Sequence, residues 1–219
     1  MKNTKIIFVR HGQSLGNAAH VLLGHTDLDL SEVGYKQAKL ASDALGDEPI
    51  DLIFSSDLIR AYNTARPFAE RRGLEVISDP GFREIFLGDW ENQPTMPLRE
   101  AKDPLFEDFC FRFGYFCAPN GESASELGDR IYAHTLDVAR RYPGKTLLVA
   151  AHAAAIRTLF GRILGYGPDE ISNDLPFPTN ASFSVCEFDG ERLFAIEFSR
   201  DGHIISELGI PSAHLVFEK

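Results

Sequence analysis

Short apolar runs recur along the chain, each bounded by polar residues or glycine. Runs at 6–9, 51–54, 74–77 and 146–150 are rich in β-branched residues and leucine. They are too short for typical helices, so the pattern predicts buried strands. Between them, apolar residues recur every three or four positions, as in helices that cover a sheet. This alternation predicts an α/β fold: a three-layer α/β/α arrangement with a mostly parallel central sheet and helices on both faces.

Polar residues mark where the predicted helices begin. Capping residues predict helix starts at Ser31, at the run Ser55-Ser56-Asp57, and at Ser123 with Glu126 as a capping box. We expect these helices to end near Leu45, Gly73 and Gly144. A further helix follows the strand at 146–150.

The segment 82–120 interrupts the alternation. It is rich in aromatic residues and carries four prolines, Pro94, Pro97, Pro104 and Pro119. We predict an inserted cap over about residues 86–120. Most of its aromatic side chains are expected to form a satellite core, and some to line a substrate pocket.

A second pattern of strands occurs near the C-terminus. Runs at 183–188 and 193–198 flank Asp189-Gly190, which predicts a hairpin. The tail from Gly202 is expected to be irregular. The chain has no internal repeat or linker-like stretch, so we predict a single domain over residues 1–219.

Composition narrows the classes of function. Hydrophobic residues make up 44% of the chain, and the net charge is −10, which argues against a nucleic-acid-binding face. No run is long enough to span a bilayer, and none is typical of a signal peptide. The three cysteines, Cys110, Cys117 and Cys186, lack metal-type spacing and favour free thiols. We expect a cytoplasmic protein that binds neither nucleic acid nor membrane. Its oligomeric state is left open, with a homodimer through the hairpin edge as one option.

The candidate chemistry lies at strand ends. The first strand is followed directly by Arg10, His11 and Gly12: a planar cation suited to phosphate, a nucleophile or base, and a glycine whose N–H can approach an anion. Arg60 falls in the first turn of a helix after the second strand, and His152 follows the strand at 146–150. Each residue alone also fits a structural role. Ligands of open α/β sheets bind beyond the carboxyl ends of strands, so convergence favours a phosphoryl-handling site.

These residues belong to longer stretches that follow one another through most of the chain. The stretches are Val9-Arg10-His11-Gly12-Gln13-Ser14-x-x-Asn17, Gly24-x-x-Asp27-x-x-Leu30-Ser31-x-x-Gly34-x-x-Gln37-Ala38, Ser55-Ser56-Asp57-Leu58-x-Arg60-Ala61-x-x-Thr64-Ala65, Phe82-Arg83-Glu84-Ile85-x-x-Gly88-x-Trp90-Glu91 and Gly121-Glu122-Ser123. Together with the surroundings of His152 they resemble the histidine phosphatase superfamily, which has the phosphoglycerate mutase-like fold. The departures are Leu23 before Gly24, and Ala153-Ala154 after His152.

The resemblance implies transfer of a phosphoryl group through a phosphohistidine at His11. It implies that Glu84 is the general acid and base, with Glu91 and Asp89 as rivals. It further implies that the phosphate and substrate contacts come from Arg10, Gly12, Asn17, Gly24, Arg60, His152 and Ala153. No metal ion or cofactor is expected.

Three functions fit this resemblance. The leading one is a metal-independent phosphatase, a phosphoric monoester hydrolase that acts on a small phosphorylated metabolite. The first alternative is a 2,3-bisphosphoglycerate-dependent phosphoglycerate mutase, which needs extra cations for a second acidic group. The cap offers Arg99, Lys102 and Arg112 but lacks the paired arginines of the mutases. The second alternative is a non-catalytic phospholigand-binding protein.

Overall fold

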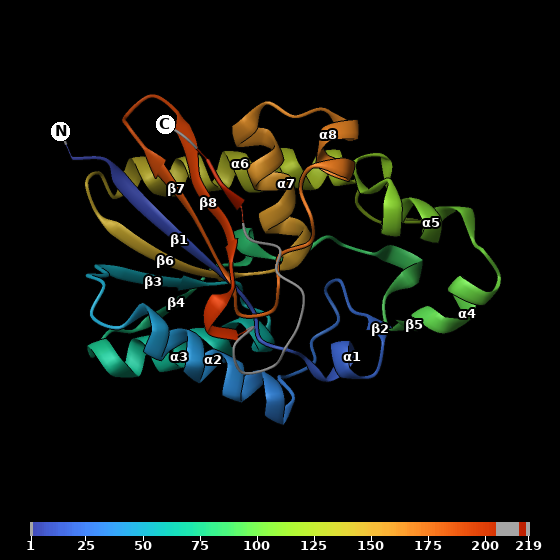
Figure 1. Cartoon of the computed structure of the whole chain (residues 1–219), viewed down its shortest axis with the longest axis horizontal. Helices are drawn as coiled ribbons and strands as arrows, with labels where there is room; N and C mark the ends of the chain where they lie inside the picture. The colour runs from blue at the N-terminus through green and yellow to red at the C-terminus, as the bar shows by residue number, and fades with distance from the viewer. Residues whose placement is uncertain (1, 205–214, 218–219) are drawn as a thin grey trace.

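The computed structural model describes residues 2–204 and 215–217, and a seven-stranded sheet lies at its centre (Figure 1). In spatial order its strands are β4 (Val76–Ser78), β3 (Leu52–Ser55), β6 (Thr146–Ala151), β1 (Thr4–Arg10), β7 (Phe183–Phe188), β8 (Leu193–Arg200) and β9 (Leu215–Val216). The first four are parallel, and the last three are each antiparallel to their neighbour. The predicted α/β fold is confirmed.

Alternate residues of β1 are buried on opposite faces of the sheet. Ile6 and Phe8 pack in a core with α6 (Ala124–Arg141) and α7 (Ala153–Leu164). Ile7 and Val9 pack in a second core with α2 (Glu32–Leu45) and α3 (Ile59–Arg72). Figure 1 shows these helix pairs on opposite sides of the sheet. Burial on both faces explains why this strand is a continuous apolar run.

The helix starts agree with the sequence at two of three places. The Ser31 hydroxyl accepts the Gly34 N–H at the start of α2, and Ser123 with Glu126 forms the capping box of α6. The prediction for α3 was wrong: the helix begins at Ile59, and its N-cap Leu58 makes no side-chain bond. The carboxylate of Asp27 accepts the Ile59 N–H instead, at 2.7 Å. The capping residue of α3 comes from a loop 32 residues earlier in the chain, so the sequence next to the helix does not reveal it.

The predicted cap segment consists of short elements, drawn in green in Figure 1. They are β5 (Gln93–Pro94), α4 (Thr95–Glu100), α5 (Pro104–Phe111) and two 3₁₀ turns, at Gly88–Trp90 and Phe113–Tyr115. After the short helix α1 (Leu15–Ala18), strand β2 (Val21–Leu22) pairs with β5 in a separate two-stranded sheet. Two-residue strands carry no periodicity, so the sequence did not reveal them. The aromatic side chains Phe106, Phe113 and Phe116 are buried in the core.

The C-terminal hairpin β7–β8 is confirmed, with β8 two residues longer than predicted. The structure also contains a 3₁₀ turn (Pro80–Phe82) and the helix α8 (Pro168–Asn173). The tail is not wholly irregular, because β9 pairs with β8 at Glu197 and Phe198; residues 205–214 lie outside the described part of the chain. The hairpin edge considered for a homodimer is thus partly paired within the chain. Among the described residues, no helix is long and apolar enough to cross a membrane.

Candidate active site

Two parallel strands bring the two predicted histidines together. Arg10 and Ala151 are paired at the ends of β1 and β6, and His11 and His152 are the residues that follow. Their ring centroids lie 5.2 Å apart. The backbone N–H of His11 donates to the carbonyl of Ala151 at 2.9 Å, which fixes the two strand ends to each other. The site therefore lies at the carboxyl edge of the sheet, where α/β folds bind ligands.

His11 is held as a neutral imidazole with one free nitrogen. Its Nδ1 lies 2.7 Å from the carbonyl oxygen of Gly12, which can only accept, so Nδ1 carries the proton. Burial, and then the charges of Arg60 and Arg10, keep the pKa of His11 well below its usual value. The Nε2 lone pair is consequently available at neutral pH, as a nucleophile requires.

Two guanidinium groups flank His11, that of Arg60 buried and that of Arg10 half-buried. Arg10 donates to the carbonyl of Pro178, and burial lowers the Arg10 pKa to about 10, so the group is still charged at neutral pH. Arg60, in the first turn of α3, donates to the carbonyls of Thr26 and Gly24 at 2.8 and 2.6 Å. Neither arginine forms an ion pair within the described residues. Two cations that are withdrawn from solvent and have no paired carboxylate form a site for an anion.

His152 is completely buried against His11. Burial and the charge of Arg60 keep its pKa well below the usual value. Neither of its ring nitrogens has a hydrogen-bond partner among residues 2–204 and 215–217. Buried polar atoms are rarely left unpaired. His152 is not among the residues that line the cavity beside His11, so its contact with a phosphate stays a prediction.

The carboxylate of Glu84 lies at the start of α7. It accepts N–H groups from Ala154 at 3.2 Å, from Ala155 at 3.0 Å and from Ile85 at 3.0 Å. Glu84 lines the same cavity as His11 and the two arginines. It is thus placed to exchange a proton with a ligand in that cavity.

The two rival carboxylates have other partners. The Glu91 oxygens accept the backbone N–H groups of His25, Thr26 and Leu87 at 2.6–3.0 Å, and so tie the 24–26 loop to the following segment. Asp89 is exposed and accepts from the side chain of Asn120. Neither is among the residues that line the cavity. The geometry favours Glu84.

Asn17, Gly24 and Ala153 all line the cavity. The Asn17 side-chain oxygen accepts the Ser14 N–H at 3.1 Å, which leaves its NH₂ group to donate. Gly24 has φ +51° and its carbonyl holds Arg60, so this glycine serves the cation more directly than the substrate. Ala153 is the first residue of α7, where a backbone N–H has no partner within the helix.

Gly12 has a different role from the one predicted. Its N–H donates to the hydroxyl of Thr64 at 3.0 Å, so it is not free for a phosphate. A β-carbon at this position would lie 2.4 Å from the carbonyl oxygen of Gly34. Glycine is needed here because two backbone segments approach closely. The sequence could not distinguish this packing from an anion contact.

The sequence analysis missed Arg130, which holds the segment that carries Glu84. Its guanidinium donates to the carbonyl oxygens of Gly81, Arg83 and Glu84 at 3.0–3.4 Å. It also forms a bidentate ion pair with Glu122 at 2.9 and 3.0 Å. The sequence offered one indication of this role: Arg130 lies in α6, about two turns after the Gly121-Glu122-Ser123 stretch, and so within reach of Glu122.

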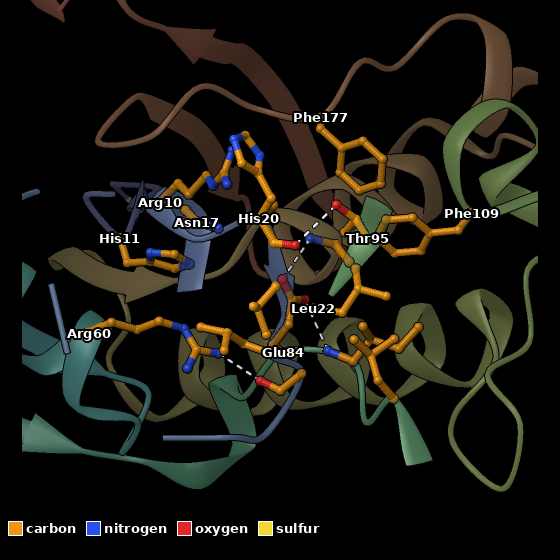
Figure 2. Close-up of a pocket in the computed structure, with 17 residues that line it drawn as sticks. Arg10, His11, Asn17, His20, Leu22, Arg60, Glu84, Thr95, Phe109 and Phe177 are labelled. Carbon is orange, nitrogen blue, oxygen red and sulfur yellow. Dashed lines mark hydrogen bonds between the residues drawn. The ribbon is translucent and has the colours of Figure 1, made fainter. Parts of the chain in front are cut away.

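The cavity holds about 310 Å³ and has two unlike ends (Figure 2). The cationic end contains Arg10, His11, Asn17, Arg60 and Glu84. The apolar end contains Leu22, Phe109 and Phe177, with Thr95 beside them, and His20 lies between the two ends. Figure 2 shows Arg10, His11 and Arg60 on one side, and Phe109 and Phe177 on the other. Within the described residues, no group of three or more His, Cys, Asp or Glu side chains is placed to hold a metal ion.

Comparison with known proteins agrees with this architecture. The probable phosphoglycerate mutase GpmB of Yersinia pestis is 35% identical over 162 residues, which cover 74% of this chain and 75% of that protein. The mycobacterial glucosyl-3-phosphoglycerate phosphatase, solved with VO₃, is 29% identical with a TM-score of 0.77, over 84% of this chain and 92% of that one. A phosphoserine phosphatase mutant from Entamoeba histolytica, solved with phosphoserine, is 25% identical with a TM-score of 0.80, over 92% and 99%.

The model of one family covers most of the chain. Residues 6–201 match the histidine phosphatase superfamily (branch 1), and this range holds both histidines, both arginines and Glu84. The matched range includes most of β1 and all the other strands of the sheet except β9, and the similar solved structures share the fold. The chain therefore belongs to branch 1 of the histidine phosphatase superfamily.

Proposed function

We propose that the protein is a metal-independent phosphatase that hydrolyses a small phosphorylated metabolite through a phosphohistidine at His11. One observation carries this proposal: all the cations that line the cavity gather at one end, around a neutral histidine with a free Nε2. The family and the phosphatases among its solved structures support the reaction class.

In the first step, the Nε2 lone pair of His11 attacks phosphorus and the P–O bond to the alcohol breaks. Arg10 and Arg60 stabilise the negative charge that spreads over the other phosphate oxygens. The carbonyl of Gly12, which accepts the Nδ1–H, stabilises the positive charge that forms on the ring. Glu84, in its protonated form, gives its proton to the leaving oxygen.

In the second step, water attacks the phosphohistidine from the side that the alcohol has left. Glu84, now a carboxylate, accepts a proton from this water. The P–N bond breaks, its electron pair returns to Nε2, and inorganic phosphate is released. Glu84 regains its proton and His11 its neutral form, so the cycle needs only the ester and water.

A phosphoglycerate mutase is the second candidate, because a relative that is 35% identical carries the name of a probable phosphoglycerate mutase. A mutase must hold a bisphosphorylated intermediate, whose second phosphate needs cations of its own. The cap cations Arg99, Lys102 and Arg112 are exposed and do not line the cavity. The geometry therefore favours hydrolysis over transfer back to the substrate.

The test is a phosphate-release assay in the presence of a chelator, run beside an assay for interconversion of 3- and 2-phosphoglycerate. We expect release from phosphate monoesters without interconversion, and an acid-labile phosphoenzyme that His11→Gln lacks. Interconversion with little release would favour the mutase. Ester binding without a phosphoenzyme or turnover would favour a non-catalytic phospholigand-binding protein.

A further inference from the structure

We propose that the alcohol released by this phosphatase is uncharged and carries a flat ring, which stacks against Phe109 and Phe177. This inference rests on the proposed function, because it concerns the leaving group of that same reaction. It is drawn from the apolar end of the cavity, which the chemistry at His11 does not use.

The apolar end offers no partner for a charged substrate group. Apart from His20, which lies between the two ends, its lining side chains in the described part of the chain are aliphatic, aromatic or a threonine hydroxyl. A carboxylate or second phosphate placed there would lose its hydration without gaining an ion pair, which is costly. The cavity volume of about 310 Å³ lies at the small end of the range for ligand sites, so it suits one ring rather than two linked nucleotides.

Phe177 is a rigid wall because a buried cation covers part of it. The guanidinium of Arg157 lies 4.3 Å from the centroid of the Phe177 ring and 5.1 Å from that of Phe113. Arg157 is itself fixed by bonds to the carbonyls of Ile171 and Ser172, at 2.8 and 3.1 Å. No carboxylate pairs with it in the described residues. Its charge is directed at the aromatic wall, which holds that wall in place.

Phe109 forms the neighbouring part of the wall. Its ring lies 5.8 Å from that of Phe177 and 5.2 Å from that of Phe116, which is buried in the cap. Packing on both sides fixes the ring in one orientation. Two preorganised aromatic side chains that face one cavity favour a planar ligand group, since aromatic pairs gain energy beyond the area they bury (Figure 2).

His20 adds one polar group between the two ends of the cavity. Its backbone is in the left-handed region, with φ +54°, which is uncommon for a non-glycine residue. Thr95 holds this conformation through two bonds to the His20 carbonyl, at 2.9 and 3.0 Å. The imidazole lines the cavity and has no hydrogen bond to the described residues. It is available to a polar atom on the edge of the ring.

The experiment compares three esters of primary alcohols: 2-phenylethyl, 2-cyclohexylethyl and 2-carboxyethyl phosphate. The first two match in size but differ in flatness, and the third carries a charge. We expect kcat/KM for the phenyl ester to exceed that for the cyclohexyl ester by about 3- to 10-fold. It should exceed that for the carboxyl ester by at least about 10-fold.

Two variants test where this preference arises. Phe177→Leu should bring kcat/KM for the phenyl and cyclohexyl esters to within about 2-fold of each other, mainly by raising KM for the phenyl ester. Phe111→Leu is the matched control, because Phe111 is a cap aromatic that is 66% exposed and lies outside the cavity. It should leave the preference unchanged.

The outcomes separate this inference from the proposed function. Turnover of all three esters with no preference for the phenyl ester, or with the carboxyl ester preferred, would overturn the inference and leave the phosphatase standing. A preference that survives Phe177→Leu and a second variant, Phe109→Leu, would also overturn it. Absence of turnover of every ester would overturn the proposed function, and the inference with it.

Discussion

The two ends of the cavity are built in different ways. The cationic end is made at the carboxyl edge of the sheet, by residues next to β1 and β6 and by the first turn of α3. The apolar end is made by side chains from β2, α5 and the loop at 174–182, which are distant in sequence and are positioned by contacts with one another. The sheet edge holds the residues of the proposed reaction, and packed loops line the end proposed for the leaving group.

The largest expected effect comes from the cationic end. His11→Ala should lower kcat by on the order of 10⁴-fold or more, because it removes the nucleophile. The thermal unfolding midpoint should change little, which calorimetry can check. A folded variant that keeps substantial turnover would contradict the nucleophile assignment.

Arg130→Met should lower kcat by about 10- to 100-fold with little change in KM. The variant removes the bonds to the carbonyls of Gly81, Arg83 and Glu84, so the carboxylate of Glu84 is held less well. Steady-state kinetics with one ester measures the effects on kcat and on KM separately.

Arg140→Met is the matched control for Arg130→Met, because Arg140 lies on the same helix and is exposed. Its kcat should equal that of the unchanged protein. An equal loss of kcat in both variants would mean that Arg130 acts through the general stability of α6.

Acid should destabilise the protein through the two buried histidines. Their pKa values are lowered well below 6.5 in the folded state, so below pH 6.5 the unfolded chain binds protons that the folded chain does not. Their contribution to stability is complete above pH 6.5 and is lost as pH falls towards the folded pKa values. The slope is about 1.4 kcal/mol per histidine per pH unit.

Urea unfolding at pH 7.5 and 5.5 measures this loss. His152→Gln should show a smaller loss than the unchanged protein, because one of the two histidines is gone. An equal loss in both proteins would show that His152 does not carry the effect.

The smallest effect is expected from the cap cations. Arg99→Ala and Arg112→Ala should each leave kcat/KM within about 2-fold for any phosphate ester, because surface charges outside a cavity contribute little. Parallel assays with 3-phosphoglycerate and a neutral ester provide the check. A selective loss with 3-phosphoglycerate would show that the cap brings a second cation to the substrate.

Much of the cationic end was predictable because it is encoded next to strands. A buried strand followed directly by Arg10 and His11, and another by His152, needed only the rule that parallel strands end at one edge. The position of Arg60 followed from its place in the first turn of a helix. The bond from Gly12 to Thr64 and the cap of α3 by Asp27 were not predictable, since each joins segments distant in sequence.

For the apolar end, the sequence predicted the type of side chain but not which residues line the cavity. The density of aromatic residues between 82 and 120 indicated a core with some pocket-lining members, and Phe109 lines the pocket whereas Phe106, Phe113 and Phe116 are buried. Phe177 lies outside that segment, in a stretch with no periodic pattern. Its place depends on Arg157, a contact between side chains that no local signal shows.

The carbonyl of Pro178, which accepts from the Arg10 side chain, has a consequence for redesign of this protein. Residues 177 and 178 are adjacent, so a backbone change made to alter ligand choice at Phe177 also moves the carbonyl that holds the Arg10 guanidinium. Helix α5, which carries Phe109, makes no hydrogen bond to Arg10 or Arg60 in the described part of the chain. A designer who wants a new substrate at full rate should therefore vary α5 first and leave the backbone at 177–178 unchanged.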